Sequence, residues 1–400
     1  MKKTILASTI GLFLGVSAAQ AEVTLYDYKE GTSAYEDAYV AGSLDLHKKR
    51  TDGQSAYSLI LDSSYDRTIS TPDRDLTYGA SLLGNVSRKG DKGADSVDAY
   101  TAAASVTADN YFVPGSNGGF WYGAAAAKKI HDSEDTSTDN DGVFTRATVG
   151  VGYGRVTNVT PMAKAIRVVD ELVRRNILRS KPSVTVYQDI ARIIAKQDEY
   201  ESRYGSADYE IKWISDIEAV VQQSGLVNNF GAAGSLKVRD VLIDENISIR
   251  RIGWKVRAGL SYIGKNFDGL TNKPGLELGG EYHLPLSNQT QFSNEAVFNA
   301  ILNDGDDGYN FNNNLSLTHE IDDRIDWENK WNLDYAKNTQ NGDDVTTNTL
   351  SSTFLYEIAN SLDFTTTASI VNVSGNDSAT ASDSDGTDRA LTMGVRYRLR

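Results

Sequence analysis

The residues that most often perform chemistry in proteins are sparse in this chain. Its 400 residues include no cysteine and four histidines, His47, His131, His283 and His319. No histidine stands at a metal-binding spacing from another, and nucleophile-elbow, phosphate-loop and zinc-protease motifs are absent from the sequence. Without cysteine, neither disulfide nor thiolate chemistry is available. We therefore expect no catalytic residue, no metal site and no cofactor, and we do not expect an enzyme.

A second group of residues, charged and regularly spaced, indicates another kind of chemistry. These residues take every second position of segments whose other positions are mostly apolar or aromatic, and they are Lys255, Arg257, Glu277, Glu281, Asp326, Glu328, Lys330, Asp334, Arg396 and Arg398. Period-two alternation predicts strands with two unlike faces. A face carrying both signs of charge suits the wall of a wet lumen better than a dry core. Its mixed sign predicts weak ion selectivity at most.

The last ten residues show this alternation most clearly. One face carries Leu391, Met393, Val395, Tyr397 and Leu399, and the other is polar. The segment resembles the C-terminal assembly signal of Gram-negative outer-membrane β-barrels, which would here consist of Thr392, Gly394, Tyr397 and Leu399. It departs from that pattern because Arg400 follows where such chains usually end. An ordinary half-buried strand is the alternative for this segment taken alone.

The N-terminus predicts export. A short basic region, an apolar stretch to Val16 and the small-x-small site Ala19-Gln20-Ala21 are typical of a secretory signal peptide over residues 1–21. No later stretch has the roughly eighteen consecutive apolar residues of a membrane helix. An exported chain that enters a membrane without such helices must do so as a closed barrel.

Composition agrees with a barrel. The hydrophobic fraction of 40% and mean hydropathy of -0.40 are low for a membrane protein, but alternating strands conceal the hydropathy signal. The 21 tyrosines and five tryptophans suit aromatic girdles at the two membrane interfaces. A net charge of -14 argues against nucleic acid as a partner.

Alternating segments recur along most of the chain and predict an all-β transmembrane antiparallel barrel of about fourteen strands. The expected strands are 36–47, 54–65, 76–88, 97–108, 119–130, 143–156, 251–265, 275–286, 290–302, 308–320, 323–336, 345–358, 361–373 and 389–400. A soluble β-sandwich is the alternative, but so many long strands favour the barrel. Short turns near Ser287, Asp322 and Asn360 alternate with longer polar loops, so both termini and the short turns should be periplasmic.

One connection differs from the others. We expect residues 22–156 and 251–400 to form the two halves of the barrel, and 157–250 to form a small periplasmic α-helical domain. Its first helix is indicated by Thr160-Pro161 and by an apolar stripe of Met162, Ile166, Val169, Val173 and Ile177. A capping box at 185–188, a cap at Ser206 with a stripe from Ile211, and residues 236–244 predict three more helices.

Outside residues 157–250, the chain is similar to porin-like Gram-negative outer-membrane barrels in its signal peptide, alternation, loop asymmetry and C-terminal segment. The resemblance implies contact with outer-membrane lipid, insertion by the barrel-assembly machinery and room for a homo-oligomer. It implies a channel for passive or gated diffusion of ions or small hydrophilic solutes. The alternative function is an envelope assembly or export component whose helical insertion docks a periplasmic protein partner.

Overall fold

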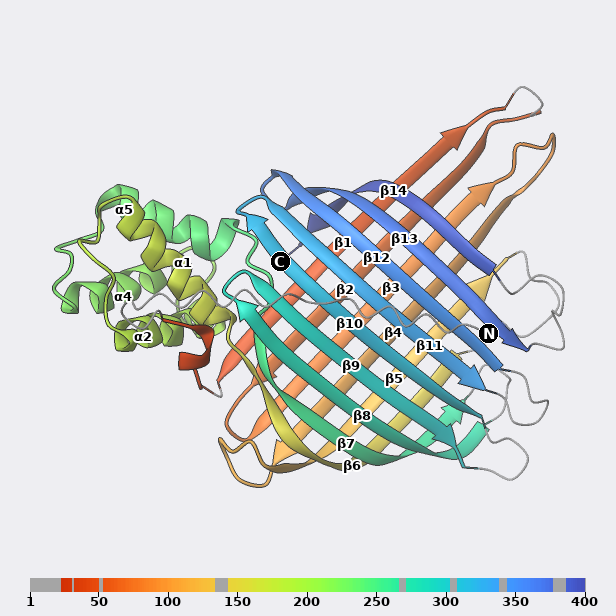
Figure 1. Cartoon of the computed structure of the whole chain (residues 1–400), viewed down its shortest axis with the longest axis horizontal. Helices are drawn as coiled ribbons and strands as arrows, with labels where there is room; N and C mark the ends of the chain where they lie inside the picture. The colour runs from red at the N-terminus through yellow and green to blue at the C-terminus, as the bar shows by residue number, and fades with distance from the viewer. Residues whose placement is uncertain are drawn as a thin grey trace, which may run out of the picture.

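The computed structural model describes residues 23–399, with gaps at 31, 50–52, 134–142, 266–270, 303–307, 338–343 and 377–385. The expected signal peptide therefore lies outside the described residues. The described chain forms a closed antiparallel barrel of 14 strands, with helices inserted between β6 and β7 (Figure 1). This confirms the fold predicted from period-two alternation. No helix among the described residues is long and apolar enough to cross a bilayer.

Neighbouring strands in the chain are neighbours in the barrel, as expected for an up-and-down connection. The strands are β1 (Ser33–His47), β2 (Ala56–Ser70), β3 (Arg74–Arg88), β4 (Ser96–Tyr111), β5 (Gly119–Asp132), β6 (Val143–Asn158), β7 (Arg251–Lys265), β8 (Thr271–Ser287), β9 (Thr290–Ile301), β10 (Tyr309–Asp322), β11 (Ile325–Lys337), β12 (Asp344–Ala359), β13 (Leu362–Asn376) and β14 (Gly386–Arg398). Each expected strand overlaps one of these, because both faces of a barrel strand stay distinct along its length.

Cross-strand register gathers like residues into rows. One row joins Leu315, Trp331, Leu350 and Ile370 of β10 to β13, and the next joins Ser316, Lys330, Ser351 and Ser369. The apolar rows face outward, where large side chains stay exposed, such as Val149 at 67% and Leu260 at 65%. An apolar exterior around a polar interior is the arrangement of outer-membrane barrels, in which lipid covers the outside.

Glycines on β6 and β7 allow aromatic rings to lie flat against the barrel wall. Phe120 and Tyr122 of β5 are fully buried. A Cβ atom built on Gly152 would stand 2.2 Å from the Phe120 ring, and one on Gly259 would stand 2.3 Å from the Tyr122 hydroxyl. These two positions therefore require glycine, and the rings occupy the space that side chains would fill.

The barrel closes through a short seam. β14 pairs with β1 only where Tyr39–Gly42 meet Val395–Arg398, whereas β1 pairs with β2 along its whole length. Gly394 lies beside this seam, where an added Cβ would stand 2.8 Å from the Gly42 carbonyl oxygen. Beyond it, β14 is exposed on both faces from Gly386 to Met393. The seam is therefore the least paired part of the barrel.

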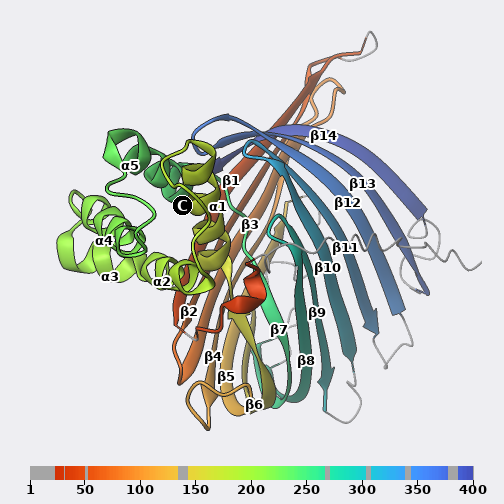
Figure 2. The ribbon, with the colours of Figure 1, turned by 60° about the vertical axis from the view of Figure 1, so that its left-hand side comes forward.

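The insertion forms a compact helical module at the end of the barrel where the short turns lie (Figures 1 and 2). Its elements are α1 (Thr160–Arg174), α2 (Val184–Ile194), α3 (Gln197–Tyr204), α4 (Tyr209–Gln223), α5 (Gly231–Arg239) and the π-helical turn η2 (Asp240–Asp244). The sequence did not predict α3, because it has no buried residue and hence no apolar stripe. Ile211, placed on the buried stripe of α4, is instead 67% exposed.

Two predicted helix starts also need correction. α2 begins at Val184, so Thr185 lies inside the helix and forms no capping box. At α1 the cap comes from outside the predicted motif: Thr160 is already helical, and its backbone N–H donates to Asn158 Oδ1 at 2.9 Å. Which side chain caps a helix start was therefore decided by the path of the backbone before the helix, which the sequence motifs did not show.

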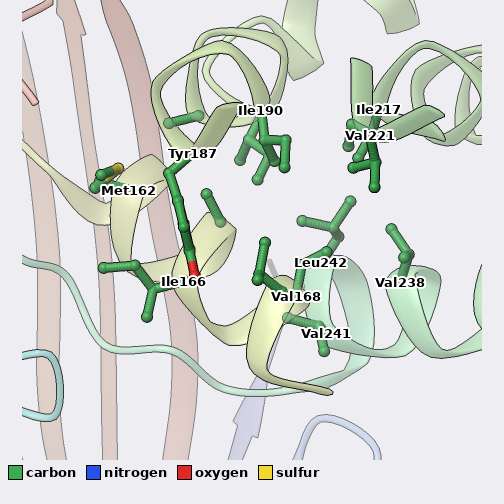
Figure 3. Close-up of a cluster of buried hydrophobic side chains, with 14 of the residues drawn as sticks. Met162, Ile166, Val168, Tyr187, Ile190, Ile217, Val221, Val238, Val241 and Leu242 are labelled. Atoms are coloured by element: carbon green, nitrogen blue, oxygen red, sulfur yellow. The ribbon is translucent and has the colours of Figure 1, made fainter. Parts of the chain in front are cut away.

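The module has its own hydrophobic core (Figure 3). Met162, Tyr187, Ile190, Ile217 and Val241 are almost completely buried within it. The N-terminal segment belongs to the same core, since Leu25 and Tyr28, in and just after the short helix η1 (Leu25–Asp27), are each 2% exposed. The apolar stripes therefore serve internal packing, and the module holds residues 25–28 as well as the insertion.

Candidate permeation pathway and its mouth

The charged residues expected to line a lumen do share the polar rows of the barrel. Register places Lys255 opposite Glu281 and Arg396 opposite Asp363. Lys255 of β7 also reaches Asp109 of β4, with β5 and β6 between them. Side chains of strands this far apart can meet only on the concave face of a curved sheet. The polar rows are therefore the inner wall of the barrel.

On this wall, Lys255 joins two carboxylates. Its Nζ atom lies 2.6 Å from Asp109 Oδ2 and 3.2 Å from Glu281 Oε1. The Asp109 side chain is 2% exposed and that of Lys255 is 11% exposed. Buried charges of this kind are tolerated only when they are paired. Much of the charge on this wall is thus neutralised locally.

His283 extends this network in a way that the sequence did not reveal. Its Nδ1 atom lies 2.9 Å from Ser293 Oγ, and its Nε2 atom lies 3.0 Å from Glu281 Oε2. Glu281, His283 and Glu295 also lie close enough together to hold a metal ion. However, Lys255 already neutralises Glu281, and the imidazole is completely buried between its partners. Glu281 and His283 share one face of β8, but only the register of β8 and β9 brings Ser293 and Glu295 to them, so the sequence did not reveal the whole group.

A second buried group surrounds Glu277. Its Oε1 atom accepts a hydrogen bond from the Tyr122 hydroxyl at 3.2 Å, and its Oε2 atom accepts one from Thr148 at 3.3 Å. Arg146 and Arg257 lie 3.4 and 3.8 Å from the same carboxylate. Two of the predicted lumen residues, Arg257 and Glu277, are therefore brought together under an aromatic ring.

The opposite wall holds the remaining predicted residues. Arg396 contacts Asp363 at 3.2 Å and Glu328 of β11 at 3.6 Å, and Lys330 contacts Glu328 at 3.1 Å. Arg398 lies 3.0 Å from Glu357 and 3.4 Å from Asp363. The Lys330 side chain is 59% exposed, whereas Arg396 and Asp363 are 15% and 3% exposed, so only Lys330 of these groups is open to solvent. Asp334 stands apart from these ion pairs and accepts a hydrogen bond from Asn312.

The composition of the wall changes along the barrel. Charged groups gather in the half nearest the short turns, where β10, β12 and β14 end and β11 and β13 begin. Further along, amides replace them: Asn299 donates to Asn310 at 3.0 Å, and Asn314 donates to Asn312 at 2.8 Å. On β9 to β14 the inner wall thus has paired charges near the short turns and mainly amides with Asp334 beyond them, whereas on β6 and β8 the Arg146–Glu277 ion pair lies further from that mouth.

At this mouth, Glu320 joins the barrel to the helical module. It lies near the end of β10, is 2% exposed, and accepts bonds from Arg250 at 2.7 Å, from the Ser248 backbone N–H at 2.9 Å and from Arg167 at 3.1 Å. At the start of β11, Asp326 accepts a bond from Asn246 at 2.8 Å. Asp326 was predicted to line the lumen, but in the structure it bonds to the helical module at the junction.

Arg250 anchors the junction. It is completely buried, and its guanidinium also donates to the Asn288 carbonyl oxygen in the β8–β9 turn at 3.2 Å. Sequence reasoning missed Arg250 and Glu320, because each is one charged residue at the edge of a strand. Their role is visible only in the folded structure, where the β8–β9 turn, the β10–β11 turn and the insertion meet.

Within the module, Lys164 of α1 has an unusual environment. Burial lowers its pKa to about 8, and nearby Glu245 opposes this shift only partly. Its Nζ atom donates to the Leu242 carbonyl oxygen at 3.0 Å. Lys164 is therefore a charged group that the helical module holds at a cost near neutral pH.

The residues of the assembly-signal segment lie on both faces of β14 and just beyond its end. Tyr397 and Leu399 point outward with 51% and 58% exposure, in line with Met393 and Val395. Thr392 and Gly394 lie on the inner row, opposite Thr367 and Thr365 of β13. This placement suits a lipid-facing closing strand, while the signal itself stays a prediction.

Comparison with known proteins gives a partial family match and a likeness in fold. A family profile described as "Protein of unknown function, DUF481" matches residues 244–358, from the end of η2 into β12. No curated protein matches the chain significantly.

Solved barrels share its architecture. The chain is similar to an anion-selective porin from Comamonas acidovorans, with 9% identity, a TM-score of 0.34, and coverage of 92% of this chain and 100% of that one. OprB from Pseudomonas putida gives 8% identity and a TM-score of 0.32, covering 92% and 93%. CdiB from Escherichia coli gives 7% identity and a TM-score of 0.39, covering 91% of this chain but 63% of that one. The likeness concerns the barrel fold and says nothing of solute or partner.

Proposed function

We propose that the protein is a channel in the Gram-negative outer membrane for the passive or gated diffusion of ions or small hydrophilic solutes. The observation that carries this proposal is the closed barrel whose inner rows are polar and whose outer rows are apolar. In a soluble protein the apolar rows would face inward, whereas a membrane pore needs them to face lipid and the polar rows to face water. The short-turn mouth and its helical module face the periplasm in this proposal.

The pattern of inner charges supports weak ion selectivity. Lys255 lies between Asp109 and Glu281, and Arg396 lies between Asp363 and Glu328. Neighbouring charges of opposite sign largely cancel, and salt screens what remains beyond roughly one Debye length, about 8 Å at physiological salt. A permeating ion therefore meets local charges but little net field. The proposal assigns the protein no catalytic role.

Conductance in planar lipid bilayers tests the channel. Purified full-length protein should give discrete conductance steps, and reversal potentials in a salt gradient should show little preference for cations or anions. Heat-denatured protein at the same detergent concentration is the control. Membranes that receive correctly folded barrels and yet stay silent would exclude a diffusion channel.

An envelope assembly or export component is the second candidate. It is favoured by the module, which has its own core and still exposes Ile211 at 67% and Leu236 at 66%. A photo-reactive amino acid at either position should then cross-link a specific periplasmic protein in cells, and one at exposed Lys196 should not. The same two positions giving no adduct would remove this candidate.

A further inference from the structure

Among the described residues, the helical insertion forms ion pairs with the barrel rim at two places that differ in strength, and the Tyr26 hydroxyl of the N-terminal segment also donates to the Pro285 carbonyl oxygen of β8 at 3.1 Å. The first is the buried junction at β10 and β11, built from Glu320, Arg250 and Arg167. The second is on β2, where Arg67 lies 2.7 Å from Asp198 of α3 and 3.5 Å from Glu36 of β1. Along the rim, β12, β13, β14 and β1 lie between β11 and β2.

The two contacts differ in exposure. Glu320 and Arg250 have side chains that are 3% and 0% exposed, and backbone groups complete their hydrogen bonds. The Arg67 and Asp198 side chains are 29% and 45% exposed. A buried pair cannot lose one partner without leaving a charge stranded, whereas an exposed pair exchanges its partner for water and is screened by salt.

A cavity separates the module from the rim beside the weaker contact. Its volume is 410 Å³, and it is lined by Tyr35 and Asp37 of β1, Arg398 of β14, Lys164 of α1 and Asp198 of α3. Tight packing resists relative motion, and a space of this size removes that resistance locally. A second cavity, of 290 Å³, borders the buried junction and is lined by Arg167 and Glu320, so the two contacts differ mainly in the burial of their ion pairs.

We propose that the module is a hinged cover for this mouth. It pivots about the junction of Glu320 with Arg250 and Arg167, and the Arg67–Asp198 pair is a latch that rising ionic strength releases. The N-terminal segment, whose Leu25 and Tyr28 pack in the module, leads into β1 and limits how far the cover can swing. Its role as a gate rests on the proposed channel function, whereas its motion does not.

The motion is measured first, because it needs no channel activity. Spin labels on cysteines replacing Gln223 of α4 and Asn360 of the β12–β13 turn report the distance between module and barrel, and both sites are exposed. Between about 0.05 and 1 M salt, over which the Debye length falls several-fold, the distance distribution should broaden toward longer values. An Arg67→Gln variant should already be broad at low salt. The pair Asp73 and Asn360, both on barrel turns, is the control and should not change.

A cross-link then tests the gate. Cysteines replacing Arg67 and Asp198, joined by a short bifunctional thiol reagent, tie the module to β2. Cysteines replacing Arg239 and Glu210, whose side chains lie 2.8 Å apart between α5 and α4, receive the same reagent without tying the module to the barrel. Releasing an exposed pair should shift the closed-to-open ratio by a factor of about two to five. The first cross-link should therefore hold the conductance at its closed level at all salt concentrations after correction for bulk conductivity, and the second should not.

The outcomes separate the two proposals. A distance distribution that ignores both salt and Arg67→Gln overturns the hinge. Conductance that stays the same with and without the Arg67–Asp198 cross-link overturns the gate. Motion without any conductance in bilayers leaves the hinge standing and rejects the channel.

Discussion

At the scale of single residues, the sequence predicted which side chains face the inner wall better than it predicted their partners. Lys255, Glu281 and Arg396 were expected on the inner wall from alternation alone, since parity along a strand is visible in sequence. Asp109, the partner of Lys255, was not expected, because it comes from β4 and their meeting depends on the whole barrel. His283 lies two residues from Glu281 on β8, but its other partner, Ser293, comes from β9. Arg250 and Glu320 were missed for the same reason.

Lys164 gives a prediction at this scale. Its pKa near 8 lies below the ordinary 10.5, so below pH 8 the folded module keeps the ammonium charged at a cost, and stability rises as pH increases from about 8 to 10.5. Lys164→Met should stabilise the module at pH 7 by at most about 3 kcal/mol, less about 1 kcal/mol for the lost bond to Leu242. It should also flatten the pH dependence.

Hydrogen exchange of the helical amides at pH 7, with barrel amides as the reference, measures the local stability. Limited proteolysis at pH 7 and pH 10 gives the pH dependence. Equal protection in Lys164→Met and the unaltered protein would show that the buried ammonium costs nothing.

At the scale of elements, alternation predicted each strand because a membrane barrel keeps one face in lipid and one in water along its length. Helix ends were harder to place. α3 lacks an apolar stripe, and the cap of α1 comes from Asn158, which belongs to a strand. Strands and helices with one buried face were therefore visible in the sequence, whereas helix ends that depend on the path of the neighbouring chain were not.

Gly152, which leaves room for the Phe120 ring, gives a testable prediction for β5 and β6. Gly152→Val would place a branched side chain where a Cβ already stands 2.2 Å from that ring, so β5, β6 or β7 must shift. Overpacking of this kind costs about 1–3 kcal/mol. The temperature at which the folded band disappears in unboiled gel electrophoresis should fall. Gly84→Val on β3, where nothing lies within 4 Å of an added Cβ, is the matched control. An equal fall in both variants would contradict the role given to Gly152.

The closing strand gives another prediction. Replacing both Tyr397 and Leu399 with Asp puts charge on the lipid face, at a cost per residue below the about 2–4 kcal/mol of an Arg or Lys at the midplane and smaller still near the interface. Levels of folded protein in the outer membrane should fall. Thr392→Asp on the inner row should be tolerated, because that side meets water. Normal levels of the Tyr397→Asp, Leu399→Asp protein would argue against these residues as an assembly signal.

At the scale of the whole molecule, chain parity determines topology. The insertion leaves β6 and returns to β7 at the same end as the short turns, as an even-to-odd connection must in an up-and-down barrel. Its length alone would have suggested the opposite side, since long connections are usually extracellular. The sequence could show this because the alternation of short and long connections runs unbroken to the C-terminus.

Sidedness follows from this parity and can be measured in intact cells. A cysteine replacing exposed Lys196 should stay unlabelled by a membrane-impermeant thiol reagent until the outer membrane is permeabilised. A cysteine replacing His47, at the other end of β1, should be labelled at once, because that end should face outward. Immediate labelling at Lys196 would reverse the proposed orientation.

The account rests on one claim above all, that water fills the inside of this barrel and lipid covers its outside. Single cysteines at Asn332 and Ser351, on inner rows, and at Leu333 and Leu350, on outer rows, test it in reconstituted liposomes. The chain contains no native cysteine, so every signal comes from the chosen site. A small water-soluble thiol reagent should label the first two positions and spare the second two. Uniform labelling, or labelling of Leu333 and Leu350 alone, would contradict a membrane pore.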